Sequence, residues 1–472
     1  MNITVKSCQI FTKCQQNIIA RFSRLYLSTQ EHTTEKKWRP AIGLEIHAQI
    51  ATNSKLFSFA STMFQKPINS SVSYFDCATP GTMPVLNRKC VEAGISTALA
   101  LSCTLNEISI FERKHYFYAD LPAGYQITQC KQPLAVNGKL CFLVGNPETN
   151  RELYMKTSKI KQIQLEQDSG RSFHDESIGR NLIDLNRAGV PLMELVFEPD
   201  LTDGEEAAAA VKELVNIFKI LENGQLVFNE TRAWDSVNKR TVPLREKEEK
   251  QDYRFMPETD LLPLRICLDN TENKYNLVDV ATLREQLPEL PYEKRRKLKE
   301  IYNLKDRLIF QICNELEFLE LFFDIIERNK NLDPNIAANF IINTLQLFLN
   351  TNDLNFDYCK NNVENIVELL DLYQSKQVNV AIAIKVLHYL NVTSDKNPSQ
   401  IIKENNWILI SDENELEIIC NRIIKENPKT VKKYKAGKQK VFKTLLRKVA
   451  ESTNDCADMN KVVLIMNRLL TS

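Results

Sequence analysis

A carboxylate and an imidazole occur two residues apart inside an apolar run near the start of the chain, AIGLEIHAQIATNSKLFS, residues 41–58. Side chains alternate faces along a strand, so Glu45 and His47 would share one face. Ile42, Leu44 and Ile46 would lie on the other face. A half-buried strand whose polar face meets water explains this pattern. A metal or catalytic site is the second interpretation, because a carboxylate and an imidazole both bind divalent cations.

Two further polar strings could take part in the same chemistry. QLEQDSGR, residues 164–171, places Glu166 and Asp168 two apart, so they would also share a face of a strand. DLNRAGVPLMELVFEPD, residues 184–200, carries Asn186 and Arg187 near its start. Each string could instead be a solvated face or a hydrogen-bonded buried network. Neither a Walker A pattern nor G-x-G-x-x-G occurs, which argues against phosphate-loop enzymes and dinucleotide-binding dehydrogenases.

Composition is that of an ordinary globular protein. The chain has 472 residues, 43% of them hydrophobic and 26% charged, which predicts roughly two to four domains. Its net charge of +1 means that any nucleic-acid binding must come from a local patch. The 12 cysteines form no C-x-x-C pair, which favours reduced thiols over a disulfide framework or a zinc site. No apolar run reaches the ~18–20 residues that span a bilayer, so we expect no membrane insertion.

The first 30 residues differ from the rest. They contain Lys6, Lys13, Arg21 and Arg24 but no acidic residue, and they can form an amphipathic helix with an apolar face of Phe11, Ile18, Phe22 and Leu25. This composition is typical of a mitochondrial transit peptide. We therefore expect residues 1–30 to be removed and the protein to reside in the mitochondrial matrix; a disordered start is the alternative.

The two halves of the chain have different local patterns. Eleven of the 12 glycines lie at or before Gly224, which predicts strands and turns there. From about Ala281 the apolar residues follow helical spacing, as in residues 308–329, 335–350 and 361–376, and Asp333 before Pro334 is a helix-start signal. The predicted class is α+β, with a mixed α/β body, a helical domain and a small helical tail, over residues 38–280, 281–396 and 397–472.

A basic patch lies in the predicted tail. Between Asn421 and Ala450 there are 11 lysines and arginines and a single acid, Glu426. Such a stripe is typical of a surface that binds a phosphate backbone. A solvated helix is the alternative, although it would normally mix in acids. The candidate RNA-binding residues are Lys432, Lys433, Lys435, Lys438 and Lys443.

Taken together, these strings resemble the GatB family, the B subunits of tRNA-dependent amidotransferases. The resemblance covers the chain from about residue 40 to 470 and is carried by strings in the same order. They are IGLEIHAQIATNSKLFS, GTMPVLNRKCVEAGI, RKHYFYADLPAGYQITQ, LEQDSGR, DLNRAGVPLMELVFEPD, ETRAWD, DYRFMPETDLLPL and ENPKTVKKYKAGKQK.

The resemblance implies a cradle-like catalytic body followed by a helical domain and a tail that binds tRNA. It implies an ATP-dependent carbon–nitrogen ligase that works in a heterotrimer with an amidase-signature A subunit, the glutaminase, and a small C subunit. With ATP and Mg²⁺, a GatB protein phosphorylates the γ-carboxylate of glutamate on Glu-tRNA(Gln), and ammonia from the glutaminase then displaces the phosphate to give Gln-tRNA(Gln). A noncatalytic tRNA-binding or scaffold role in the same complex is the alternative.

The resemblance also assigns roles to residues. Glu45 and His47 match the family's GLEVH element, which helps to hold a divalent ion, and Glu166 and Asp168 match the first and third acids of its EEDAG element. The expected catalytic residues are these four, and the expected metal ligands are Glu45, His47 and Glu166. The expected contacts to ATP or substrate are Lys55, Tyr125, Gln126, Asn186 and Arg187, with Tyr125 and Gln126 in a turn after Pro122 and Gly124.

Two departures from the family pattern matter. Only Cys77 and Cys90 lie where many members carry paired zinc-binding cysteines, so we expect no zinc. After residues 207–220 the chain passes directly to LENGQLVFNETRAWD, residues 221–235, which lies several dozen residues later in the family. The resemblance thus implies that an internal segment carrying a strand and a further acidic ligand is missing.

Overall fold

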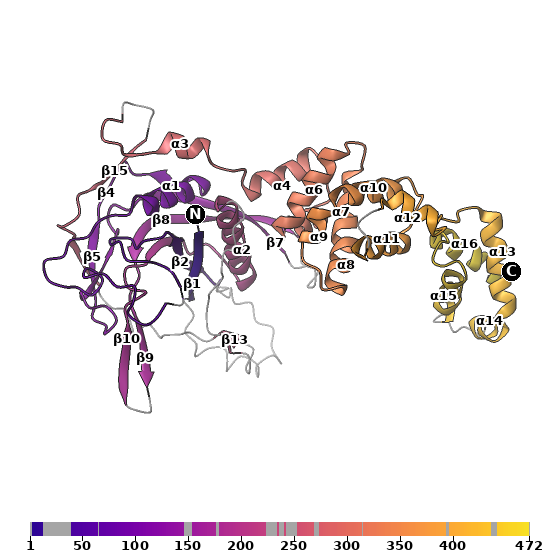
Figure 1. Ribbon diagram of the computed structural model, residues 1–472, viewed down its shortest axis with the longest axis horizontal. Coiled ribbons are helices and arrows are strands. Elements are labelled where there is room, and N and C mark those ends of the chain that lie inside the picture. The colour runs from indigo at the N-terminus through magenta and orange to yellow at the C-terminus, as the bar shows by residue number, and fades with distance from the viewer. Residues whose placement is uncertain are drawn as a thin grey trace, which may run out of the picture. The chain divides into compact units, whose positions relative to one another are not determined.

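The computed structural model describes residues 2–12, 39–64, 66–145, 153–175, 179–222, 234–235, 240–241, 253–268, 273–313, 315–392, 396–435 and 441–471. The chain divides into two compact units, Met1–Lys294 and Arg295–Ser472. The sheets belong to the first unit, whereas the second is helical (Figure 1). The fold is therefore α+β, as predicted.

The centre of the first unit is an antiparallel sheet with the strand order β1-β2-β11-β8-β7-β3. Along β2 every second residue is buried and its neighbours are half-buried, which is the alternation that the sequence predicted. The buried residues Leu44, Ile46 and Ile50 belong to the main hydrophobic core. The strands are β1 (Asn2–Thr12), β2 (Ile42–Ala51), β11 (Pro191–Phe197), β8 (Tyr154–Gln167), β7 (Ala135–Val144) and β3 (Thr104–Leu105).

Two helices cover the apolar face of this sheet, α1 (Arg88–Ala100) and α2 (Gly204–Leu221) (Figure 1). Each begins at a capping side chain: Asn87 accepts a hydrogen bond from the Lys89 amide, and Asp203 from the Glu206 amide. Their alanines let the helices approach the sheet closely. The opposite face of the sheet is left for polar side chains.

A second, three-stranded sheet, with the order β14-β5-β6, contacts the main sheet where β6 lies against β8. Arg113 on β5 holds this sheet to the segment after β14 through paired hydrogen bonds of 2.7 Å to both carboxylate oxygens of Glu258. The other described strands form a further three-stranded sheet, β16-β15-β4, and two hairpins, β9-β10 and β12-β13. The strands are β14 (Arg254–Pro257), β5 (Glu112–His115), β6 (Tyr125–Thr128), then β16 (Val278–Asp279), β15 (Leu264–Cys267), β4 (Ile108–Ser109), then β9 (Arg171–Asp175), β10 (Arg180–Asp184), β12 (Trp234–Asp235) and β13 (Arg240–Thr241).

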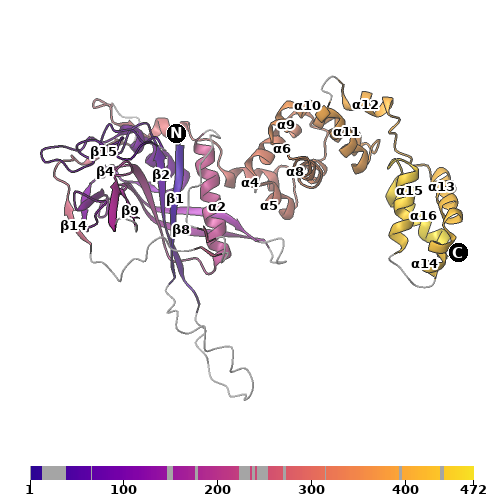
Figure 2. The same ribbon diagram turned by 60° about the horizontal axis from the view of Figure 1, so that its bottom comes forward.

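The start of the chain differs from the expected helix. Residues Asn2–Thr12 form β1, which runs antiparallel to β2 at the edge of the main sheet (Figure 2). The segment begins with Ile3, Thr4 and Val5, whose branched side chains favour strands. Part of the segment that we expected to lie outside the fold thus belongs to the sheet, whereas most of the expected helix, residues 13–30, lies outside the described residues.

Helix α3 (Val280–Glu285) contacts α1, so the first unit extends past the predicted boundary at residue 280. Helix α4 (Pro291–Glu300) spans the division between the units. Asp333 caps the helix that starts at Pro334, as predicted, and the helical spacing over residues 308–329 belongs to two helices. The next helices are α5 (Asp306–Cys313), α6 (Leu316–Arg328), α7 (Pro334–Phe340), the π-helix Ile341–Leu345, α8 (Gln346–Thr351), α9 (Asp357–Asn361), α10 (Val363–Gln374), α11 (Val380–Val392) and α12 (Pro398–Glu404).

The last helices have a core of their own, which includes Leu416, Leu445 and Val462. They are α13 (Glu413–Glu426), α14 (Pro428–Lys435), α15 (Phe442–Ser452) and α16 (Met459–Thr471). Within the described part of the chain, no helix combines the length and the apolar character that crossing a bilayer requires.

Gly138 on β7 offers a test of the packing. A Cβ there would overlap Cys103 Sγ and lie 3.2 Å from the backbone oxygen of Leu101. Gly138→Ala should therefore lower the free energy of unfolding by about 1–3 kcal/mol, measured by urea denaturation. Gly204→Ala is the matched control, because a Cβ at that helix start meets nothing within 4 Å; equal losses in both variants would contradict the packing argument.

Candidate functional site

The polar face of the main sheet brings together side chains from three neighbouring strands. Glu194 on β11 lies opposite His47 on β2 and opposite Gln164 on β8. Residues directly opposite one another in antiparallel strands share a face. Glu166 belongs to the same face, because it lies two residues from Gln164. The β14-β5-β6 sheet covers these residues, since the Gln164 amide donates to Thr128 Oγ1 on β6 at 3.2 Å.

Glu45, His47 and Glu194 form a group that could hold a cation. One ligand atom from each can be chosen so that all lie within 4.8 Å of one another. His47 Nε2 lies 3.9 Å from Glu45 Oε1 and 3.6 Å from Glu194 Oε1, too far for good hydrogen bonds. That nitrogen and Glu166 Oε2 are buried without a hydrogen-bond partner. An imidazole nitrogen without a hydrogen-bond partner, between two carboxylates, fits a divalent cation.

The carboxylates set the charge of His47. Burial by itself lowers the pKa of His47, but its contact with the Glu194 carboxylate and the negative charges of Glu194, Glu166 and Glu45 outweigh that effect and raise the pKa to about 9. Burial and the neighbouring Glu166 raise the pKa of Glu194 to about 7, against the opposing effect of His47. At neutral pH and without a cation, His47 is therefore an imidazolium that partly balances the acids.

Lys114 on β5 supplies a second positive charge to this group. Its ammonium lies 3.8 Å from Glu166 Oε1 and 5.0 Å from the centre of the Tyr253 ring. Burial alone would lower the pKa of Lys114, but the carboxylates of Glu166, Glu194 and Glu45 raise it. The site thus holds the acids Glu45, Glu166 and Glu194. Two positive charges face them: Lys114, and His47 when it is protonated.

The predicted acids occupy different places. Glu166 is buried in the cluster, but Glu194 rather than Glu166 completes the closest group of possible ligands with Glu45 and His47. Asp168 was expected on the same strand face as Glu166, yet β8 ends at Gln167. Asp168 directly follows the strand and forms an ion pair of 3.5 Å with Arg187 Nε. The strand that carries Glu166 thus ends one residue before Asp168.

Arg187 and Asn186 lie in a turn, where they differ in availability. The Asn186 side chain accepts from the Ser71 amide at 2.7 Å and donates to the Pro67 oxygen at 2.7 Å, so it is used within the protein. Arg187 donates to the backbone oxygens of Ser169 and Gly170, but its side chain remains 41% exposed. Of these two, only Arg187 can still reach a ligand.

The remaining substrate candidates are enclosed. Lys55 was expected to meet a phosphate, but its side chain is 0% exposed and its ammonium lies 2.9 Å from Asp76 Oδ2. Tyr125 and Gln126 open strand β6 instead of lying in a turn. Gln126 is buried and donates to the Gln167 oxygen at 2.8 Å, whereas Tyr125 is half-buried below the Arg113 guanidinium, 4.7 Å from its ring centre.

Aromatic side chains lie next to the charged cluster. Tyr116 makes edge contacts with Tyr118 and with Tyr253, whose ring also receives Lys114. Phe117, which lies between Tyr116 and Tyr118 in the sequence, is 88% exposed. Such rings can stack on a nucleobase, which makes this aromatic group a candidate contact for one.

The basic residues of the tail are only partly described. Lys432 and Lys433 on α14 and Lys443 on α15 are exposed, in agreement with a surface role. Lys435 ends α14 but its side chain is not described, and Lys438 lies outside the described residues.

Glu194 and Lys114 were missed in the sequence, although each left a signal. Glu194 is the only charged residue in the strand PLMELVF, and charged residues are almost never fully buried unless paired. Lys114 stands at the start of the aromatic string, two residues from Glu112 on the same strand, so a second charged residue falls on one strand face. The role of each residue depends on a partner that is distant in the sequence, His47 for Glu194 and Glu166 for Lys114, and the sequence alone does not identify these partners.

Comparison with known families agrees with this architecture. Residues 40–228 and 223–272 match the family described as the GatB/GatE catalytic domain, and residues 320–470 match the family described as the GatB domain. The site therefore lies in a catalytic domain of the GatB/GatE class, to which a helical GatB domain is joined.

Named relatives extend the match to nearly the whole chain. It is 41% identical to the mitochondrial glutamyl-tRNA(Gln) amidotransferase B subunit of Aedes aegypti, over 93% of this chain and 94% of that one. The corresponding human mitochondrial protein is 37% identical over 95% and 91%. The aspartyl/glutamyl-tRNA(Asn/Gln) amidotransferase B subunit of Rickettsia canadensis is 34% identical over 92% and 97%. The chain belongs to the GatB family.

The comparisons also locate the missing segment. The alignment with the Aedes aegypti protein extends over 497 positions although it covers only 93% of a chain of 472 residues, so several dozen positions have no counterpart here. The catalytic-domain match is made in two pieces that meet at residues 223–228, directly after α2. Both observations agree with the missing internal segment near residue 220 that the resemblance implies.

The raised pKa of His47 predicts how cation binding depends on pH. A cation that uses Nε2 must displace the proton that His47 carries below pH 9. The affinity for Mg²⁺ should therefore rise between pH 7 and pH 9, by up to about tenfold per pH unit for one released proton. Calorimetry in buffers of different ionisation enthalpy measures both quantities. In His47→Gln about one proton fewer should be released on binding, the remaining pH dependence coming from Glu194, and an affinity independent of pH in the unsubstituted protein would exclude His47 as a ligand.

Proposed function

We propose that the protein is the B subunit of a mitochondrial tRNA-dependent amidotransferase. It would convert Glu-tRNA(Gln) into Gln-tRNA(Gln) with ATP, in the matrix, together with a glutaminase partner (the A subunit) that supplies ammonia and a small C subunit. The names of the relatives and the basic, acid-free first 30 residues support this assignment. The observation that carries the chemistry is the convergence of Glu45, His47 and Glu194 on one face of the main sheet.

The residues of the cluster suit phosphoryl transfer, which depends on positioning and on neutralising charge. Glu45, His47 and Glu194 would hold Mg²⁺, which supplies charge neutralisation for the phosphates of ATP. Lys114 keeps the acids in place by balancing Glu166 from the covering sheet. Arg187, half exposed beside Asp168, is placed to hold the phosphate or carboxylate of the substrate through its guanidinium.

Formation of the amide requires a base as well. Ammonia loses a proton when it displaces phosphate from the activated carboxylate, and a nearby base can accept that proton. Glu166 Oε2 is a candidate, because it is buried and no side chain or backbone group of the described residues donates a hydrogen bond to it. Its other oxygen lies 3.8 Å from Lys114 Nζ, which keeps the group in position.

A noncatalytic tRNA-binding or scaffold role is the second candidate. Its support is the absence of several dozen positions between α2 and the ETRAWD string. Hydrolysis of ATP by the assembled complex separates the two roles, because only the catalytic role requires ATP turnover at the cluster.

Substitutions in the cluster test the catalytic role. Glu45→Gln, His47→Ala and Glu194→Gln should each lower Gln-tRNA formation by about 10²-fold or more, because a misplaced cation loses much of its charge stabilisation. The rate is measured with the assembled complex and with glutamine as amido donor. Glutaminase activity should persist, since that chemistry belongs to the glutaminase partner.

Two controls accompany this experiment. His388→Ala removes an exposed histidine of the helical unit and should leave the rate unchanged. Free ammonium in place of glutamine distinguishes activation from ammonia delivery. Recovery of the cluster variants with ammonium would show that these residues serve delivery, and would refute the proposed role in activation.

The tail lysines provide the test of tRNA binding. Replacing Lys432, Lys433 and Lys443 with Glu should weaken tRNA binding and reduce its salt dependence, by roughly one unit of slope for each lost phosphate contact. Binding is measured by filter retention over a range of KCl concentrations. Lys330→Glu, an exposed lysine outside the tail, is the control. An unchanged affinity and slope in the triple variant would remove the tail from the tRNA interface.

A further inference from the structure

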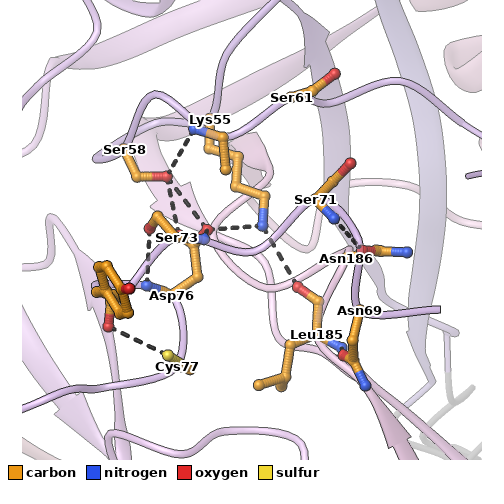
Figure 3. A network of polar contacts seen from close by, with 12 residues as sticks. Lys55, Ser58, Ser61, Asn69, Ser71, Ser73, Asp76, Cys77, Leu185 and Asn186 are labelled. Atoms are coloured by element: carbon orange, nitrogen blue, oxygen red, sulfur yellow. Dashed lines mark hydrogen bonds and ion pairs between the residues drawn. The ribbon is translucent and has the colours of Figure 1, made fainter. Parts of the chain in front are cut away.

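The loop that follows β2 is held by a buried ion pair (Figure 3). Lys55 and Asp76 lie 21 positions apart, and their side chains are 0% and 1% exposed. The distance from Lys55 Nζ to Asp76 Oδ2 is 2.9 Å. Burial lowers the pKa of Lys55, against the opposing effect of Asp76. Taking two charges out of water is costly, and removing one partner leaves the other charge uncompensated.

The carboxylate of Asp76 makes its hydrogen bonds to residues of this loop. Its carboxylate accepts hydrogen bonds from Ser58 Oγ at 3.0 Å and from the Ser73 amide at 2.8 Å, besides the ion pair. Its amide donates to Ser73 Oγ at 3.1 Å. Lys55 and Asp76 therefore join the two ends of the loop in one polar network (Figure 3).

The same network reaches the turn that separates β10 from β11. Lys55 Nζ lies 3.4 Å from the Leu185 oxygen, and the Leu56 amide donates to the Gly189 oxygen at 3.0 Å. Gly189 has a φ of +80°, and a Cβ there would lie 2.8 Å from Asp76 Oδ1. The turn thus lies directly on the ion pair, and only a glycine fits this position.

From this turn the connection continues into both strands of the site. Gly189 donates to the Asp168 oxygen and Asp168 to the Val190 oxygen, each at 2.9 Å. Asp168 directly follows β8, which carries Glu166, and Val190 directly precedes β11, which carries Glu194. A shift of the turn would therefore move the ends of the two strands that present these acids.

Apolar packing does not fix the loop by itself. Leu56 and Phe57 are buried in the core, but Phe59, Met63 and Phe64 are 84%, 68% and 67% exposed. Polar contacts take over beyond Phe57: the Asn69 side chain accepts from the Leu185 amide at 2.7 Å and donates to the Ile183 oxygen at 3.0 Å. The ion pair is the one buried charged contact in this set, so it is the contact whose loss should matter most.

We propose that Lys55 is a positioning residue and not a phosphate ligand: its ion pair with Asp76 fixes the turn over residues 185–190 and thereby the ends of β8 and β11. The catalytic meaning of this positioning rests on the proposed function, whereas the positioning itself does not.

A double-mutant cycle tests it in the assembled complex. Lys55→Met leaves the carboxylate unpaired and Asp76→Asn leaves the ammonium unpaired, while the double variant removes both charges and keeps an amide oxygen for Ser58 and Ser73. Hydrogen exchange should be about tenfold faster or more in peptides covering residues 164–170 and 185–194 of each single variant. Exchange in the double variant should return close to that of the unsubstituted protein, and peptides of α13–α16 serve as the internal reference. Lys66→Met, which removes an exposed lysine of the same loop, should change nothing.

Kinetics separate positioning from phosphate binding. A positioning role predicts that both single variants lose Gln-tRNA formation and that the double variant recovers it with an unchanged KM for ATP. A phosphate ligand predicts the opposite order: Asp76→Asn remains active, and Lys55→Met and the double variant both fail with a raised KM for ATP. That order would overturn the proposal, and so would exchange that increases only within residues 54–76. If the single variants do not assemble, the double variant decides by the same two readouts.

The failure of the proposed function would look different. A complex that forms no Gln-tRNA with ATP even without substitutions would refute the catalytic assignment. The exchange measurements would still decide whether Lys55 and Asp76 position the turn.

Discussion

The balance of charge between the two sheets of the first unit is the constraint on which the site depends. Glu166 and Glu194 are almost completely buried, and buried charges are tolerated only when they are paired or hydrogen-bonded. Lys114 comes from the covering sheet and His47 from the main sheet, so both sheets must be in place before the acids are compensated. Folding of the body and assembly of the site are therefore the same event. The alternation along β2 serves both needs, because its apolar face packs in the core while its other face presents Glu45 and His47 to the cluster.

The sequence predicted most of the architecture but less of the site. Alternation and helical spacing are local, so the strand around Glu45 and the helix start at Asp333 could be found from neighbouring residues alone. The partners of a buried charge are not local. Glu194 meets His47 only because β11 pairs with β2, and Lys55 meets Asp76 only because the loop returns on itself. A lysine in a polar string looks available for a phosphate until its burial is known.

The missing segment lies outside the parts of the chain that build the cluster. Glu45, His47, Glu166, Glu194 and Lys114 come from β2, β8, β11 and β5, and all of them precede α2, after which the match to the catalytic family is interrupted. The described residues bring these side chains together without any contribution from the interrupted region. The cluster therefore forms without the missing segment. Any ligand that this segment supplies in other members of the family would be added to a cluster that is already formed.

The pairing of β1 with β2 has a consequence for the maturation of the chain. β2 carries Glu45 and His47, and its neighbour on one side is the segment Asn2–Thr12, which belongs to the expected import signal. Proteolytic removal of that signal would leave a row of backbone amides and carbonyls of β2 without partners, and an open sheet edge readily recruits another strand. The exposed edge of β2 would then have to be covered soon after import, by a chaperone or by another protein, or the mature chain would self-associate through the strand that bears the candidate site.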